Sequence, residues 1–313
     1  MSIEQFVGEI VKELNKKTGL VVKEHRARKN NGVIFTGVAI IEPGCNVAPT
    51  LYVDAYWKQY MNGRSFEQII DELIERYKVS RIDSNVDIHY FMNYENVKNH
   101  IVYKLVNYES NVEELKARPH KKYLDLAIVF YYIMNNDSFP DATVQITNAH
   151  INVWGIDVEE LFTVATKNTP DLLKASFKGM SEVMMEMALK KGIVEITEEE
   201  VQEVLGKIKE EKNIKLKDDY GMYVLNNQTK MCGAVSMLYE GVLSDIAERL
   251  DSNFYILPSS IHELILIDAD ICDDVEHLKE MVQQVNDTEL EKTEILSYNV
   301  YHYDRAIDEI TIA

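Results

Sequence analysis

An apolar strand at residues 265–267 leads directly into two aspartates, Asp268 and Asp270. Carboxylates two residues apart on an extended chain point to the same side, and Mg²⁺ prefers oxygen ligands. This spacing is typical of a metal site and indicates a metal-dependent hydrolase as one hypothesis. The structural alternative is that Asp268 and Asp270 end the strand, and that Asp273 or Asp274 caps the helix that follows.

A second polar group lies at residues 258–263, where two strands are expected to meet. It holds Ser259, Ser260, His262 and Glu263. A serine beside a histidine can act as a nucleophile when the imidazole reaches its hydroxyl, and His262 or Glu263 could also assist the hydrolase. Neighbours in a tight turn seldom face each other in that way, and a turn of solvated polar residues is the alternative. We predict that these four residues form a binding site and assign no catalytic residue.

The common catalytic signatures are absent from the sequence. It contains no GxxxxGK[ST], GxGxxG, HExxH or GxSxG motif, which removes the usual evidence for nucleotide binding, zinc proteolysis and serine hydrolysis. Its eight histidines are scattered, and none lies four residues from another as helix-borne metal ligands do. The sequence therefore predicts no cofactor, and it leans away from an enzyme.

The chain is strongly acidic. Its 313 residues include 33 lysines and arginines against 52 aspartates and glutamates, a formal charge of −19. A positive surface is needed to release counterions from a polyanion, so this charge argues against direct nucleic-acid binding. It suits solubility, a basic partner protein, or mimicry of a nucleic acid.

Compartment signals point to the cytoplasm. The three cysteines, Cys45, Cys232 and Cys272, are odd in number and widely spaced, as expected of free thiols. The longest apolar run, Leu124–Met134, is 11 residues and contains Asp125, so it is too short to span a bilayer and predicts a buried strand. The first residues carry no basic and apolar leader pattern, so we expect no signal peptide and no membrane contact.

Apolar spacing predicts the elements of the first 80 residues. A helix at 3–17 is followed by strands at 20–28 and 33–41 around the turn Asn30–Gly32, a third strand at 50–57, and a helix after Ser65. A capping box of Ser65 with Gln68 is expected at that second helix. A sheet needs helices to cover its apolar face, so this order predicts a layered α+β unit.

The apolar spacing of the remaining residues also predicts strands and helices, although the patterns are weaker in the middle of the chain. The predicted strands are 101–108, 123–134, 143–147, 222–226, 232–238, 253–257, 263–267 and 295–303, and the predicted helices are 156–168, 172–191, 239–250 and 275–285. The helix at 156–168 has Asp157 as its cap, and Thr169-Pro170 is expected to end it.

The fold class that follows is α+β, built from two or three sheet-and-helix layered modules. We expect an N-terminal α-β-β-β-α module at 1–84, a middle α/β region at 85–192, and a C-terminal β-β-α-β-β-α-β module at 219–313. Residues 193–218 are highly charged with a narrow apolar stripe, and predict a helical spacer or a flap.

Two further features allow more than one interpretation. Lys23, Arg26, Arg28 and Lys29 place positive charge on the first hairpin, either to bind a phosphate or acidic partner or to protect a sheet edge. A second basic cluster flanks Pro119. The methionines of the 172–191 helix are expected to fill the core, with an adaptable binding surface as the alternative. These methionines are Met180, Met184, Met185 and Met187.

Several segments resemble one known family. The residues are 46–53 (NVAPTLYV) with 63–65, 146–148 leading to 154–156, 253–260 (NFYILPSS) with His262 and Glu263, and 296–305 (LSYNVYHYDR). They resemble a family of proteins of unknown function from anaerobic gut bacteria, over nearly the whole chain. The resemblance implies bacterial origin, and it brings no activity and no catalytic residue.

Three functions are compatible with this sequence. The first is a non-enzymatic, cytoplasmic protein-binding or adaptor module whose partner is another protein, a basic one among the candidates. The second is the metal-dependent hydrolase that uses Asp268 and Asp270. The third is an acidic decoy of a nucleic-acid-binding protein.

Overall fold

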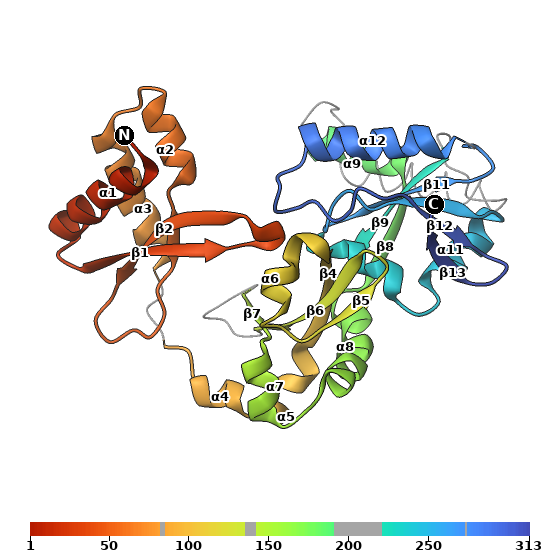
Figure 1. The fold of residues 1–313 in the computed structure, drawn as a ribbon, viewed down its shortest axis with the longest axis horizontal. Helices are drawn as coiled ribbons and strands as arrows, with labels where there is room; N and C mark the ends of the chain where they lie inside the picture. The colour runs from red at the N-terminus through yellow and green to blue at the C-terminus, as the bar shows by residue number, and fades with distance from the viewer. Residues whose placement is uncertain (82–84, 135–141, 191–220, 273) are drawn as a thin grey trace. The chain divides into compact units, whose positions relative to one another are not determined.

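The computed structural model describes residues 1–81, 85–134, 142–190, 221–272 and 274–313, and its ribbon is shown in Figure 1. The chain folds into two compact units. We call Met1–Asn96 with Met134–Ala142 unit 1, and Val97–Ile133 with Thr143–Ala313 unit 2. Among the described residues, no helix is long and apolar enough to cross a membrane.

Unit 1 is a three-stranded antiparallel sheet with helices against it. The strands follow the order β1-β2-β3. Its elements are α1 (Ile3–Thr18), β1 (Val21–Arg28), β2 (Ile34–Ile41), β3 (Thr50–Tyr52), α2 (Asp54–Met61), α3 (Phe66–Ser80), α4 (Ile88–Met92) and α5 (Tyr94–Val97), the last of which runs into unit 2.

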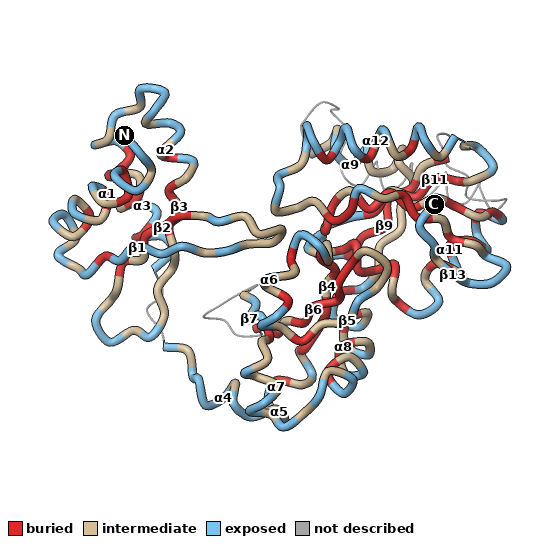
Figure 2. Tube along the Cα trace, viewed as in Figure 1, coloured by how far each residue is buried: buried red, intermediate tan, exposed pale blue. Residues whose placement is uncertain are grey.

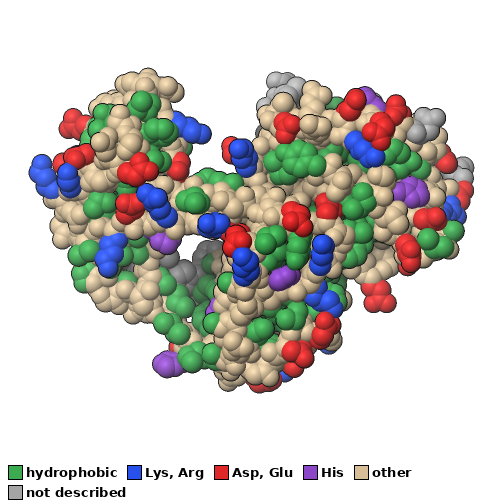
Figure 3. Space-filling view, viewed as in Figure 1, with side chains coloured by type: hydrophobic (Ala, Val, Ile, Leu, Met, Phe, Trp, Pro, Cys, Tyr) green, Lys and Arg blue, Asp and Glu red, His purple; other side chains and the backbone are tan. Residues whose placement is uncertain are grey.

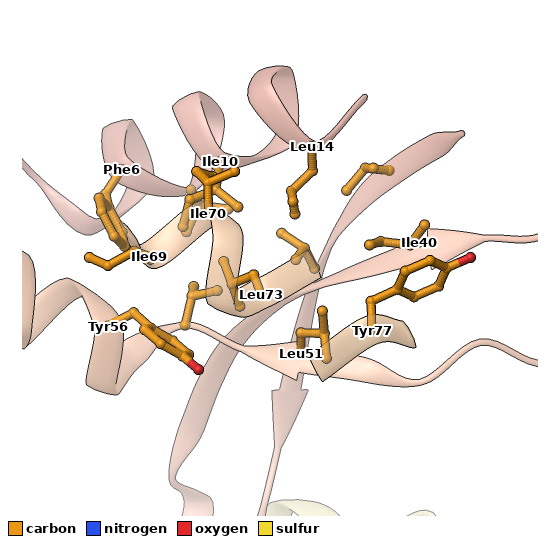
Figure 4. Close-up of a cluster of buried hydrophobic side chains, with 14 residues drawn as sticks. Phe6, Ile10, Leu14, Ile40, Leu51, Tyr56, Ile69, Ile70, Leu73 and Tyr77 are labelled. Carbon is orange, nitrogen blue, oxygen red and sulfur yellow. The ribbon is translucent and has the colours of Figure 1, made fainter. Parts of the chain in front are cut away.

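The core of unit 1 lies between the sheet and helices α1 and α3 (Figure 4). Phe6, Ile10 and Leu14 repeat on one face of α1 and are fully buried, which is the amphipathic pattern that predicted this helix. Ile70 and Leu73 of α3 pack into the same cluster. Helix α1 ends at Gly19, whose φ of 70° is the left-handed conformation that glycine adopts most easily.

The β1–β2 hairpin begins in this core and extends out of it. Val22, Val38 and Ile40 are buried at its base, whereas no residue from Lys23 to Phe35 is buried (Figure 2). The turn is the predicted Asn30–Gly32 segment, with positive φ at Asn31 and Gly32. Unit 1 therefore carries a projecting hairpin whose anchored end is firmly packed.

Unit 2 contains two antiparallel sheets. The six-stranded sheet has the order β13-β12-β10-β11-β9-β8, and in the four-stranded sheet β6 pairs with β4, β5 and β7. The strands are β4 (Ile101–Asn107), β5 (His120–Tyr123), β6 (Leu126–Ile133), β7 (Thr143–Gln145), β8 (Ala175–Gly179), β9 (Met222–Asn227), β10 (Phe254–Leu257), β11 (Leu264–Asp268), β12 (Tyr301–Asp304) and β13 (Glu309–Ile312).

Helices cover both sheets of unit 2. α8 packs on β4, where the rings of Phe162 and Tyr103 lie 6.1 Å apart, and α12 buries Leu278 and Val282 against the larger sheet. The helices are α6 (Val112–Leu115), α7 (Asn148–Trp154), α8 (Val158–Leu172), α9 (Met180–Lys190), α11 (Val242–Leu250) and α12 (Val275–Thr288), with the short 3-10 helix η4 at Gly233–Leu238.

Much of the sequence-based prediction is confirmed. The fold is α+β with several separate sheets, and most predicted helices and strands appear within a few residues of their expected bounds. Asp157 caps α8 by accepting the Glu160 N–H at 2.8 Å, and Asp274 caps α12 by accepting the His277 N–H at 3.0 Å. The predicted spacer at 193–218 falls within 191–220, outside the described residues.

Several element predictions are wrong where pairing with a distant strand overrides a local pattern. Residues 175–179 of the predicted helix 172–191 form β8, because they pair with β9. The predicted third strand ends at Tyr52, and Asp54 opens helix α2. Residues 233–238 form η4 rather than a strand, and Ile295–Val300 precedes β12 rather than belonging to it.

Helix ends and burial differ from expectation at three places. Ser65 precedes α3 but makes no capping hydrogen bond through its side chain. α8 continues through Pro170, because the ring is tolerated near the end of the helix, where the chain is about to leave it. Met184 and Met187 are 55% and 57% exposed instead of filling the core, because β8 takes up the preceding residues and turns this face of α9 outward.

The start of α7 depends on a neutral histidine. The His150 Nδ1 accepts the Thr147 N–H at 3.0 Å, and the imidazole stacks on Trp154 with ring centroids 5.6 Å apart. Burial lowers the pKa of His150. A lowered pKa favours the neutral form in the folded state, so this group adds stability above the unfolded pKa of about 6.5.

Acidification is therefore expected to destabilise unit 2 as the pH falls below about 6.5 and through the folded pKa of His150. The loss should be about 1 kcal/mol, the usual value of a helix cap. His150→Gln keeps an acceptor that does not titrate, and should flatten this part of the pH dependence. Urea unfolding followed by Trp154 fluorescence, in a Trp57→Phe background, measures the change. Identical pH profiles for the two proteins would contradict this assignment.

Candidate functional site

The predicted binding residues lie on the connection between β10 and β11, and hydrogen bonds fix its backbone on two sides. The Ile261 N–H donates to the Glu294 carbonyl at 2.9 Å, and the Ser259 carbonyl accepts the Leu296 N–H at 3.0 Å. On the other side, the Ile261 carbonyl accepts the Ala234 N–H at 3.2 Å. This connection is part of the folded framework rather than a freely solvated turn.

The four predicted side chains are close in sequence but differ in their surroundings. Ser260 is buried, and its Oγ accepts the backbone N–H of His262 at 3.0 Å. Ser259 is half-buried, and Glu263 is exposed. The Ser260 hydroxyl thus meets the backbone of His262 and not its imidazole, which is not the geometry of a serine nucleophile with its base.

The imidazole of His262 lies between two other groups. Its Nδ1 accepts the Cys232 backbone N–H at 3.2 Å, and its Nε2 lies 3.8 Å from Glu294 Oε1. Because Nδ1 is an acceptor, the neutral ring carries its proton on Nε2, which faces the carboxylate. The side chain of His262 is 36% exposed, and its contacts hold the loop before η4 in place.

A turn at Asn227–Lys230 was predicted from the sequence between the strands expected at 222–226 and 232–238, but the contacts of the loop from Asn227 to Gly233 were not. Asn227 is fully buried; its Nδ2 donates to the Met231 carbonyl and its Oδ1 accepts the Thr229 hydroxyl, both at 2.8 Å. A Cβ on Gly233 would lie 2.5 Å from the His262 carbonyl oxygen, so only glycine allows this approach. The one signal available was the run of turn-forming residues after β9.

Asp268 and Asp270 lie at the far end of β11 from His262. Asp268 is fully buried, and its Oδ1 accepts the Asp270 N–H at 3.0 Å, while Asp270 itself is exposed. The expectation that His262 or Glu263 lies near these aspartates is wrong, because the five residues of β11 separate them by roughly 15–20 Å. Among the described residues, no three His, Cys, Asp or Glu side chains group as metal ligands. A metal at Asp268 and Asp270 stays a prediction.

A carboxylate that the sequence analysis missed accepts three side-chain hydrogen bonds among the described residues of unit 2. Asp125 follows β5, and its Oδ2 accepts the Ser297 hydroxyl at 2.6 Å and the Asn299 Nδ2 at 3.0 Å. Its Oδ1 accepts the Tyr301 hydroxyl at 2.6 Å. The donors come from the segment that leads into β12, more than 170 residues along the chain.

These contacts join the two sheets of unit 2. The Asn107 side chain adds a further bond to the Leu296 carbonyl at 3.0 Å. Burial, and then the Asp125 carboxylate, raise the pKa of Tyr301, so its hydroxyl stays protonated and remains a donor. Asp125 was visible in the sequence as the one charge within an apolar run, but nothing local indicated its partners. The hydrogen bonds of Asp125 connect the two sheets, so we assign this residue a structural role.

Comparison with known proteins identifies the family but no activity. The model of the Family of unknown function (DUF5688) matches residues 3–305. The chain belongs to DUF5688. This match confirms the expected membership in a family of unknown function over nearly the whole length, and it spans both units of the DUF5688 protein. No curated protein and no solved structure matches the chain.

Replacing Asp125 should destabilise unit 2 strongly. Asp125→Asn puts an amide NH₂ against groups that are themselves donors, and should lower the free energy of unfolding by about 2–4 kcal/mol. Tyr301→Phe removes one bond and should cost about 1–2 kcal/mol. Asp171→Asn, an exposed carboxylate on α8, is the matched control and should stay within about 0.5 kcal/mol of wild type.

Urea unfolding followed by Trp154 fluorescence in the Trp57→Phe background gives these values. An Asp125→Asn protein as stable as the Asp171→Asn protein would show that the network contributes nothing and that Asp125 is available for another role.

Proposed function

We propose that this DUF5688 protein is a non-catalytic, cytoplasmic protein-binding or adaptor module, and that it binds its partner through the β1–β2 hairpin of unit 1. The hairpin supports this proposal: it has a packed base and a long, exposed outer part. Rigid elements that project polar and apolar side chains into solvent need little ordering on binding, which favours affinity.

The contacts in unit 2 support the non-catalytic part of the proposal. Ser260 accepts a backbone N–H, His262 orders the Cys232 loop, and Asp125 ties two sheets together. Each of these side chains, which a hydrolase could use, already has a defined structural partner. By contrast, Lys23 and His25 on the hairpin have neither an ion pair nor a hydrogen bond from their side chains to the described residues.

The charge distribution supports the acidic-decoy hypothesis as the second candidate function. Residues 97–313 carry 21 lysines and arginines against 39 aspartates and glutamates, a formal charge of −18, whereas residues 1–96 carry 12 against 13, a charge of −1. A basic partner would be drawn to the second region and not to the hairpin. The two hypotheses therefore predict different surfaces and different responses to substitution in the hairpin.

A partner identified by mass spectrometry and then purified tests the proposal. Wild-type full-length protein should form a binary complex with it in calorimetry. Lys23→Glu/Arg26→Glu should weaken that complex at least tenfold, and Lys12→Glu/Lys58→Glu, the same change in net charge on α1 and α2, should leave it intact. A complex whose affinity is unchanged by the hairpin substitutions, or the absence of any binary complex, would contradict the proposal.

A further inference from the structure

Strand β1 has one paired side and one open side. All eight of its residues pair with β2, from Val21 with Ile41 to Arg28 with Ile34, and β3 lies on the far side of β2. With eight residues, β1 is the longest edge strand in the described sheets, and only Val22 is buried in it. The edge is therefore long and accessible.

The direction of each backbone group follows from the hydrogen bonds at the two ends of β1. The Lys29 N–H donates to the Val33 carbonyl at 2.7 Å, so the odd-numbered residues of β1 bond to β2 and the even-numbered residues face the other way. In agreement, the Val22 N–H donates to Asn15 Oδ1 of α1 at 2.9 Å. Helix α1 thus satisfies the beginning of the outer edge.

Beyond Val22 this cover stops. The backbone N–H and C=O groups of Glu24 and Arg26 face outward and have no hydrogen-bond partner in the described parts of the chain. An open edge of this kind is a template for an added strand. Because eight pairs with β2 already fix its conformation, another strand can join without reordering it.

The side chains along this edge select the charge of the strand that can pair. Within residues 23–29, four basic residues (Lys23, Arg26, Arg28 and Lys29) accompany one carboxylate, Glu24, although the total charge of the chain is −19. Figure 3 shows basic side chains along the hairpin. Arg26 contacts Glu24 at 3.0 Å and Glu4 at 3.9 Å, whereas Lys23 makes no such ion pair to the described residues.

The charge of β1 also favours an acidic segment over a second copy of the chain as the added strand. In a second copy of the chain, β1 would bring three basic residues and a single carboxylate, so it could neutralise fewer of the basic residues at this edge than an acidic segment would. Carboxylates on an incoming strand would instead meet positive charge on both faces of the sheet, since Lys23 and Arg26 point to opposite faces.

We propose that an acidic, extended segment of a partner protein adds to the open edge of β1 as a fourth strand of the unit 1 sheet. This inference rests on the proposed protein-binding function and specifies how the hairpin recognises its partner. Backbone bonds to Glu24 and Arg26 provide the attachment, and the basic side chains provide the preference for acidic sequence.

A labelled peptide measures this directly. The probe is a fluorescein-labelled ten-residue peptide of alternating Glu and Val, titrated with the full-length protein and followed by fluorescence anisotropy. The wild type should bind it and should not bind the matching Lys and Val peptide. Lys23→Glu/Arg26→Glu should weaken binding at least tenfold, and Lys12→Glu/Lys58→Glu should leave it unchanged.

Two substitutions at Glu24 separate strand addition from simple charge attraction. Both remove the same carboxylate. Glu24→Thr keeps the outward N–H and should bind the acidic peptide as tightly as wild type or more tightly. Glu24→Pro removes the outward N–H and places a ring at the edge, but it leaves the bonds to β2 intact, since position 24 does not donate to β2. It should weaken binding at least tenfold.

Equal binding by Glu24→Pro and Glu24→Thr would overturn the proposal, because charge alone would then explain the affinity. Tighter binding of a ten-nucleotide oligo-dT than of the acidic peptide would overturn it in favour of a nucleic acid. Circular dichroism and Trp57 emission verify that each variant is folded. If the peptide fails to bind while a purified partner still requires the hairpin, strand addition is wrong and the proposed function stands.

Discussion

A buried backbone or side-chain polar group that lacks a hydrogen-bond partner costs about 1–3 kcal/mol, and this cost places most of the informative polar residues of the chain. In unit 2 it brings Ser297, Asn299 and Tyr301 to the carboxylate of Asp125. It also fixes the connection between β10 and β11, where Ser260 and His262 satisfy backbone donors. Side chains that could take part in catalysis therefore make hydrogen bonds that stabilise the fold instead.

The same constraint distinguishes β1 from the rest of unit 1. Asn15 supplies an acceptor to the Val22 N–H where the strand leaves the core. Farther along, Glu24 and Arg26 turn their backbone groups to solvent, where water can satisfy them until a strand replaces it. Lysine and arginine along an edge strand disfavour indiscriminate pairing with other strands, and they leave this edge open to an acidic segment. The same basic side chains thus protect the edge of β1 from unspecific strand pairing and favour binding of an acidic partner.

The sequence correctly predicted the elements that are determined by residues near one another in the chain. Helix α1 follows from its apolar stripe and Gly19, and the hairpin follows from Asn30–Gly32 between two β-rich runs. Prediction failed where the reason is distant. β8 exists because it pairs with β9, across more than 40 residues, and the methionines after it are left exposed on α9.

The candidate site divides in the same way. The basic residues of the hairpin could be predicted directly from the sequence, because four positive charges lie within seven residues. That the edge of β1 is open could not, since this depends on which strand lies beside it. The role of Asp125 was equally hidden, because its partners lie more than 170 residues away. Asp268 and His262 are near neighbours in sequence, but a strand holds them apart.

Amide hydrogen exchange at residue resolution in the free protein tests the central claim most directly. If the outer side of β1 is open, protection must alternate along the strand: the Lys23, His25 and Ala27 amides should exchange slowly, and those of Glu24 and Arg26 at close to the rate of an unfolded peptide. Equal protection at all five positions would mean that the edge is already covered, and would contradict this account.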